Sequence, residues 1–180
     1  MKKKMIIFMV LVSIILIAQT GEKMEELTVE QKMHNYMAIE MNIQTWNLLT
    51  KEDRNPQEST KMIYCALASK YHWLKSPYFK PVNEQRAEWL LSRVFCEINN
   101  GEKALYYAEK CLELTKINDF KDFDLAYAYE AMARANGVLQ NEKELARYYK
   151  LAKKSGRKIS NEDDKKLFFD DLNSGILKKR

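Results

Sequence analysis

Apolar residues recur at intervals of three and four along most of the chain, the spacing that places them on one face of an α-helix. Polar turns divide this pattern into segments that cover approximately residues 29–49, 56–76, 83–98, 102–116, 122–138, 142–156 and 160–174. In the first segment the expected buried stripe is Val29, Met33, Tyr36, Ile39, Ile43 and Trp46. The pattern therefore predicts an all-α protein of about seven helices joined by short connections.

Several residues mark where these helices begin and end. Thr28 and Gln31 have the spacing of a capping box, and Pro56 occupies a position that suits the first residue of a helix. Asp122 is expected to cap the helix that follows it, and Gly175 is expected to end the last helix.

Two helical pairs, residues 85–118 and 126–159, align with each other at a spacing of 41 residues. The aligned positions are Leu91 with Met132, Ser92 with Ala133, Phe95 with Asn136, Ala104 with Leu145, Ala108 with Tyr149, and Cys111 with Ala152. Small residues at such positions let neighbouring helices approach closely. The chain is therefore expected to contain a repeated helical hairpin.

This arrangement of large and small residues resembles the tetratricopeptide repeat, whose period is about 34 residues. Glu88 stands where that pattern has Trp, with Trp89 beside it. A wider resemblance, to small bacterial tetratricopeptide-like proteins of unassigned function, covers most of residues 35–172. It is carried by His72-Trp73, Pro81-Val82-Asn83, Arg86, Glu88-Trp89, Ser92-Arg93 and the run from Phe123 to Arg134. The resemblance implies antiparallel hairpins stacked as a short right-handed solenoid, and it implies no activity.

The predicted organisation follows from these segments. It comprises a signal-like or mis-called segment at 1–23, a degenerate helical pair at 24–76, a linker at 77–84, two repeats at 85–159, and a solvating cap helix with a tail at 160–180.

The amino-terminal segment has two interpretations. Lys2, Lys3 and Lys4 precede 14 uncharged, mostly apolar residues from Met5 to Ala18, which is typical of a secretory signal and too short for a transmembrane helix. In that case the protein is an exported or membrane-tethered assembly factor that contacts a membrane only through residues 1–20. Alternatively, translation starts at Met24, which favours a cytoplasmic protein.

Charge and cysteine content exclude some classes of function. The net charge is +5, of which residues 1–23 supply four lysines and one glutamate, or +3, and this leaves +2 for the rest. A domain so close to neutral is not expected to bind nucleic acid. Cys65, Cys96 and Cys111 have no CxxC spacing, and we expect them to act as small buried hydrophobic residues rather than as disulfides or metal ligands.

The candidate ligand-binding residues lie on the first helix of each repeat, which lines the concave groove in the family that the chain resembles. They are Arg86, Trp89 and Arg93 on one helix, Tyr127, Glu130 and Arg134 on the next, and His72 at the edge of the groove. Each helical set shares one face. Arginines and aromatic rings suit an acidic or C-terminal peptide. The alternative is an internal ion-pair network in which Glu88 or Glu130 contacts Arg93 or Arg134.

The sequence thus predicts a non-enzymatic module that binds a peptide or protein partner, with no cofactor or metal. A small-molecule or anion sensor that uses the same groove is an alternative. An enzyme would need His72 to meet Glu88 or Glu130 in one cavity, and the sequence contains no GxGxxG, P-loop, HExxH or GxSxG motif. His34 is the only other histidine, so a metal site built on His72 is not expected.

Overall fold

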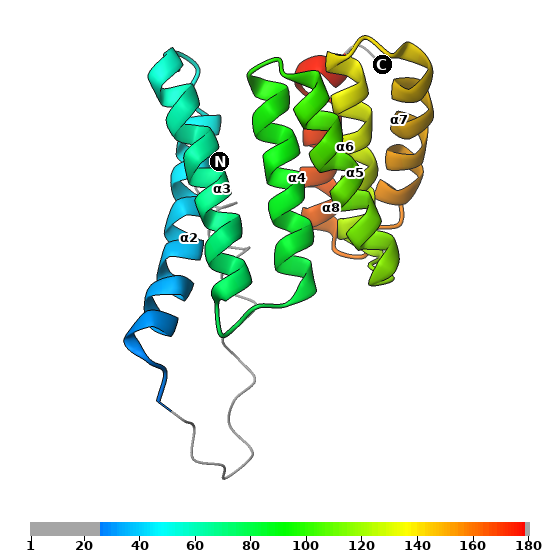
Figure 1. The fold of residues 1–180 in the computed structure, drawn as a ribbon. Coiled ribbons are helices and arrows are strands. Elements are labelled where there is room, and N and C mark those ends of the chain that lie inside the picture. Colours follow the sequence, from blue (N-terminus) through cyan, green and yellow to red (C-terminus); the bar gives the residue numbers. More distant parts are fainter. Residues whose placement is uncertain (1–25, 179–180) are drawn as a thin grey trace.

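The computed structural model describes residues 26–178, and within that range the chain forms seven α-helices and a short 3-10 turn (Figure 1). They are α2 (Val29–Leu49), α3 (Pro56–Lys75), α4 (Pro81–Glu97), α5 (Gly101–Ile117), α6 (Asp122–Val138), α7 (Glu142–Gly156), α8 (Glu162–Leu172) and η1 (Gly175–Leu177). The all-α prediction is confirmed. The interpretations of residues 1–23 as a signal or a mis-called start lie outside the described residues.

The helices stack as antiparallel hairpins in chain order (Figure 1). The pairs α2–α3, α4–α5 and α6–α7 each pack closely, and each pair contacts the next through α3 with α4 and through α5 with α6. The first helices α4 and α6 also contact each other, and α8 packs on α6 and α7. The predicted stack of hairpins is therefore confirmed.

Local sequence explains where the early helices start. The Thr28 side chain accepts the Gln31 N–H, and the Gln31 side chain accepts the Thr28 N–H in return. The linker prediction of 77–84 was too long, because α4 begins at Pro81. Asn83 Oδ1 accepts the Lys80 N–H at 2.7 Å and so anchors this start. Proline suits the first helical position because it lacks the N–H that the helix leaves unpaired there.

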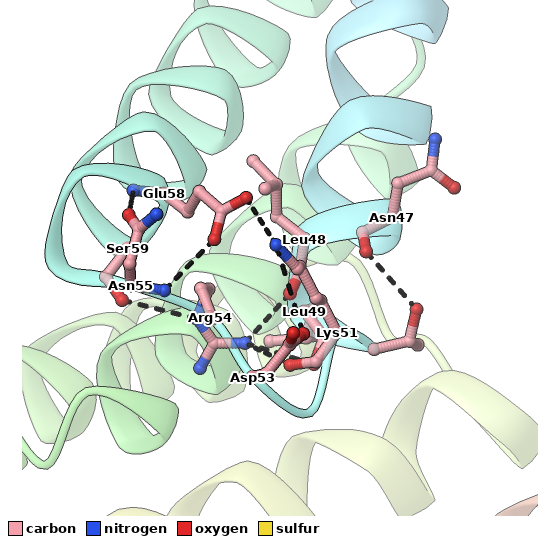
Figure 2. A network of polar contacts seen from close by, with 10 residues as sticks. Asn47, Leu48, Leu49, Lys51, Asp53, Arg54, Asn55, Glu58 and Ser59 are labelled. Carbon is pink, nitrogen blue, oxygen red and sulfur yellow. Dashed lines mark hydrogen bonds and ion pairs between the residues drawn. The ribbon is translucent and has the colours of Figure 1, made fainter.

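The turn between α2 and α3 is held by Arg54 (Figure 2). Its Nη1 donates to the Leu48 carbonyl at 2.8 Å, and its Nε donates to Ser59 Oγ at 3.3 Å. Lys51 donates to Glu58 at 2.6 Å across the same turn. Since the last carbonyls of a helix have no partner within it, Arg54 supplies the hydrogen bonds that end α2 and orient α3.

The two later hairpins follow one register. Helices α4 and α6 each span 17 residues, and their starts at Pro81 and Asp122 differ by 122 − 81 = 41 positions. The starts of α5 and α7, Gly101 and Glu142, differ by the same 142 − 101 = 41 positions. All the aligned positions predicted from the sequence are buried except Tyr149, which is half-buried. The repeated pattern therefore marks the helix interfaces of α4–α7.

The buried stripe predicted for the first helix is wrong over its first two turns. Val29 is 86% exposed and Tyr36 is 62% exposed, and the fully buried residues of α2 are His34, Ala38 and Thr45. Ile39, Ile43 and Trp46 are half-buried. Helix α2 packs mainly on α3. With one main neighbour, it buries a narrow face of small side chains and leaves large apolar residues uncovered.

Asp122 does not cap α6 as predicted. Lys121 holds the cap position, and Asp122 is the first helical residue with φ of 53°. Its carboxylate accepts the Ser160 hydroxyl at 2.6 Å and the Ser160 N–H at 3.2 Å. This contact joins the start of α6 to the segment that leads into α8.

The last helix differs from its prediction in extent and in role. It begins at Glu162 after the cap residue Asn161, and it ends at Leu172 rather than at Gly175. Gly175 has φ of +54°, a conformation that favours glycine, and it opens η1. Phe168 and Leu172 are fully buried. The segment is thus part of the core and not only a solvating cap.

Candidate functional site

The register of α4 and α6 brings most of the predicted site residues into one cluster. Glu130 of α6 is fully buried and lies at its centre. It accepts Trp89 Nε1 at 3.2 Å, Arg93 Nη1 at 3.3 Å and Arg134 Nε at 2.6 Å. A buried carboxylate with three donors is fully engaged, and the internal ion-pair network considered from the sequence is what Glu130 forms.

Tyr127 and Arg134 bind the chain's own C-terminal segment. The Tyr127 hydroxyl donates to Asp171 Oδ2 at 2.8 Å. Arg134 donates through Nη2 to the Asp171 carbonyl at 2.9 Å and through Nη1 to the Ser174 carbonyl at 3.3 Å. Two residues predicted to hold a ligand therefore hold α8 and the turn that follows it.

Arg86 is also paired, although it is more accessible. Its guanidinium donates to both carboxylate oxygens of Asp124, at 2.8 and 3.3 Å, and its Cζ lies 6.0 Å from the centre of the Phe123 ring. Glu88, considered from the sequence as a partner of Arg93 or Arg134, instead accepts Lys70 of α3 at 2.6 Å. The three arginines of the predicted site thus all have carboxylate partners within the protein.

A pocket opens beside this cluster, where the first helices of successive pairs meet α8. It is lined by Asn42 and Trp46 of α2, Gln85, Arg86 and Trp89 of α4, Phe123, Asp124 and Tyr127 of α6, and Leu167 and Asp171 of α8. The space among these side chains measures about 550 Å³ with its open side included, and about 30 Å³ of it admits the centre of a water molecule. The pocket is therefore small and suits one small group.

Aromatic rings form much of the pocket wall. Trp46 and Trp89 lie 5.8 Å apart between ring centres, and Trp89 meets Tyr127 edge-on at 5.1 Å. Phe123 lies 4.5 Å from Tyr127. These distances are within the range of favourable ring pairs, so the wall is preformed.

Two polar groups of the pocket lining lack full pairing within residues 26–178. The Asp171 carboxylate accepts the Tyr127 hydroxyl and has no arginine or lysine nitrogen within ion-pair distance. Gln85 is buried, and its Oε1 has no hydrogen-bond partner, while its Nε2 donates to Thr115 Oγ1 at 3.0 Å. Burial raises the pKa of the Asp171 carboxyl. Burial, and after it the Asp171 charge, raises the pKa of the Tyr127 hydroxyl.

His72 does not join the other predicted site residues. Its Nδ1 lies 2.9 Å from His34 Nδ1 at the interface of α2 and α3, and its ring meets Tyr71 edge-on at 5.3 Å. One of these two Nδ1 atoms must carry a proton and the other must accept it. Burial, and then the neighbouring His34, lowers the pKa of His72. The expectation that His72 borders the groove is therefore corrected.

The expectation that the cysteines are buried holds for Cys65 and Cys111, whereas Cys96 is half-buried. All three are free thiols, with Cys65 and Cys111 buried. Burial raises the pKa of the Cys96 thiol to about 12 and also raises the pKa values of Cys65 and Cys111.

Within the described part of the chain, no group of three or more His, Cys, Asp and Glu side chains is placed to hold a metal ion. No helix among residues 26–178 has the length and apolar character needed to cross a membrane.

Sequence reasoning missed Asp171, Gln85 and Trp46 as members of the site. Asp171 carried a usable signal, because it lies three residues after Phe168 and four after Leu167 and so shares their inward face. A carboxylate inside an apolar stripe is unusual enough to mark a candidate. Gln85 carried no comparable signal, since the sequence does not distinguish a glutamine that will be buried from one that will be exposed.

No protein-family model, curated protein sequence or solved structure matched this chain. The function is therefore argued from the geometry of the pocket and its surroundings.

Proposed function

We propose that this chain is a non-enzymatic, tetratricopeptide-like module that binds a short segment of a protein partner at the face bordered by α2, α4, α6 and α8. The observation that carries the proposal is the solvent-open pocket that these four helices line. Preformed aromatic walls offer contact area at little cost in conformational entropy, which is typical of binding surfaces. Repeat stacks use the faces of successive first helices in this way.

The charged residues around the pocket support binding rather than catalysis. Glu130 is engaged by three donors and Glu88 by Lys70, so neither carboxylate is placed to act with His72. His72 contacts His34 instead. The thiols, with raised pKa values, are poor nucleophiles near neutral pH. Glu130, His72 and the thiols are thus engaged in packing and pairing, which supports binding over a reaction centre built from them.

A small-molecule sensor remains the second candidate, and one observation favours it. The pocket has α2 on one side and α8 on the other, so the walls enclose a short stretch rather than a long groove. A compact ligand satisfies such a site without contacts beyond the pocket. The anion version of this candidate loses support because the arginines are paired.

Peptide selection with a matched pair of variants tests the proposal. The full chain is immobilised and exposed to a pool of random short peptides, and so are Leu167→Trp and Asn42→Trp, which fill the pocket from α8 and from α2. Tyr106→Ala, on the exposed face of α5, is the control. We expect the wild type and the control to retain peptides that both filled variants lose.

Each other outcome is informative. Equal retention by the filled variants would overturn the proposed site. Retention of small molecules from a metabolite mixture by the wild type, with no peptide retained, would replace the proposal by the sensor. Circular dichroism and the unfolding temperature of each variant establish that the fold is intact.

A further inference from the structure

The charged side chains around the pocket are paired unequally. Arg86 pairs with Asp124, while Glu130 takes both Arg93 and Arg134. These pairings leave Asp171 as the carboxylate of the pocket lining with no cation partner among the described residues.

Asp171 is held in place by the backbone and by one hydroxyl. Arg134 reaches the main-chain carbonyl of Asp171 rather than its carboxylate, and Tyr127 donates to one carboxylate oxygen. Among residues 26–178 the Tyr127 hydroxyl is the donor found for this carboxylate, and Arg93 and Arg134 act on it only from beyond ion-pair distance. Burial is the main cause that raises the pKa of this carboxyl, and the charge of Arg93 lowers it. A partly buried carboxylate with one hydrogen bond is costly to keep charged unless a cation joins it.

The aromatic rings of the same pocket suit a positive charge. Trp46, Trp89 and Tyr127 line it together, and the faces of such rings carry negative electrostatic potential. An N–H-bearing cation in this position is attracted by the rings and by Asp171. The pocket admits a group no larger than a few water molecules, which matches the end of a side chain.

Gln85 does not offer a ligand a second acceptor. Its Nε2 donates to Thr115 Oγ1 and to the Asp124 carbonyl, which fixes the orientation of the amide. Its buried Oε1 then has no partner, although buried amide oxygens in proteins are nearly always hydrogen-bonded. Gln85 lines the pocket, but its Oε1 is closed off from solvent, as are the unpaired Glu88 Oε2 and Ser92 Oγ, so the acceptor exposed in the pocket is the Asp171 carboxylate.

From these observations we propose that the pocket binds a nitrogen cation, the guanidinium or ammonium group at the end of an arginine or lysine side chain, paired with Asp171 and packed against Trp46 and Trp89. The inference rests on the proposed function and reverses the charge of the ligand expected from the sequence. It follows because the arginines that suggested an acidic ligand are occupied by the protein's own carboxylates.

Titration of the full chain with short capped peptides tests this inference. The probes are acetyl-Gly-Arg-Gly-amide, its Lys and Glu counterparts, and free methylguanidine, followed by isothermal calorimetry and by tryptophan fluorescence. We expect the Arg and Lys peptides to bind and the Glu peptide not to bind. Binding of methylguanidine alone at equal affinity would assign the site to a small cation, and binding only as a peptide side chain would assign it to a protein segment.

The decisive variants are Asp171→Asn and Asp170→Asn, neighbours on α8. Asn at 171 keeps an acceptor for the Tyr127 hydroxyl but removes the charge, and we expect at least about tenfold weaker binding of the Arg peptide. Asp170 is exposed, so its variant should bind as the wild type does. Because the carboxylate is partly buried, Asp171→Asn should unfold at the same temperature or a higher one, which separates binding from stability.

A dependence on pH provides a second readout. Protonation of Asp171 removes its charge, so binding should weaken as the pH falls through its raised pKa. The groups facing Asp171 are Tyr127, Glu130 and Arg134 of α6 and Arg93 of α4. The variant Asp171→Asn should lose this dependence.

Three results would overturn the inference: tighter binding of the Glu peptide, equal binding by Asp171→Asn, or no binding of any cationic probe. If the wild type also retains peptides of other composition from the random pool, the proposed function stands and only the charge of the ligand is wrong. If the wild type retains no peptide from the random pool, the proposed function and this inference both fail.

Discussion

The hairpins α4–α5 and α6–α7 differ from α2–α3 in what covers them. Each helix of the later pairs contacts at least two other helices, as α3 does through α2 and α4, and Leu91, Val94, Leu145 and Ala152 are buried. The outer face of α3 instead carries a row of exposed Tyr64, Leu67, Tyr71 and Leu74, and the start of α2 exposes Val29, Met33 and Tyr36.

This contrast shows that helical periodicity identifies an apolar face but does not say whether another helix covers it. Inside a stack the apolar face of a helix is usually the covered face, because successive helical pairs bury each other. At the end of the stack a face of the same composition stays exposed, and small residues such as Ala38 form the contact instead. Predictions of the core therefore hold best for helices with neighbours on both sides.

The largest effect should come from the buried ion pairs of the later hairpins. Glu130→Gln leaves Arg93 and Arg134 without a carboxylate, and we expect a loss of about 3–5 kcal/mol in the free energy of unfolding by urea. Glu26→Ala removes the exposed pair with Lys32 beside α2 and should cause no measurable loss. Equal losses of stability from Glu130→Gln and Glu26→Ala would contradict the difference between the later hairpins and the first one.

A pair of leucine truncations compares the two regions directly. Leu91→Ala empties a fully buried site of α4 and should cost about 2–5 kcal/mol. Leu67→Ala lies on the exposed row of α3 and should change stability by less than about 0.5 kcal/mol. A large loss for Leu67→Ala in urea unfolding would mean that something covers this row in solution.

A smaller effect is expected where α8 joins the stack. A Cβ atom on Gly156 would overlap the ring of Phe168, so Gly156→Ala must displace α8. We expect a loss of about 1–3 kcal/mol, measured by thermal unfolding. Hydrogen exchange of the same variant should show faster exchange in α8 and unchanged exchange in α3. Unchanged exchange in both helices would contradict this packing.

Acid should loosen the first hairpin selectively. The pKa of His72 is lower in the folded chain, so its contribution to stability is present above about pH 6.5 and is lost as the pH falls through the lowered value. The raised pKa values of Glu88 and Asp171 act in the opposite sense, since their contributions are lost as the pH rises. Hydrogen-exchange protection, measured relative to the intrinsic exchange rate at each pH, should therefore fall in α2 and α3 between pH 7.5 and 5, with His72→Gln as the control. A uniform fall in protection along the chain would contradict this expectation.

The fold was largely predictable because its signals are local. Capping at Thr28, the proline at position 56 and the aligned small residues of the repeat each act over a few positions. The start of α4 was missed although Pro81 carried the same signal as Pro56. The surface of α2 was missed because burial depends on neighbours that periodicity does not identify.

The membership of the candidate site was predictable only in part, since His72 lies elsewhere and Asp171, Gln85 and Trp46 were missed. Trp89, Arg93, Tyr127, Glu130 and Arg134 do meet, because the register of α4 and α6 follows from the repeat. Their charges allowed either a surface for an acidic ligand or an internal ion-pair network, and Asp124 and Glu130 of α6 pair with the arginines. No spacing in the sequence indicates that Asp171 approaches Tyr127, since 44 residues separate them.

The common register of α4–α5 and α6–α7 has a consequence for how such a chain could grow. Each helix of the second hairpin starts 41 residues after the matching helix of the first. An in-frame duplication of 41 codons therefore yields another unit with matching interfaces. The short connection before α6, residues 118–121, is a natural point of insertion, because each unit contacts mainly its neighbours. Array length is then a variable that recombination can change in single steps while the two terminal structures, α2–α3 and α8, stay as they are.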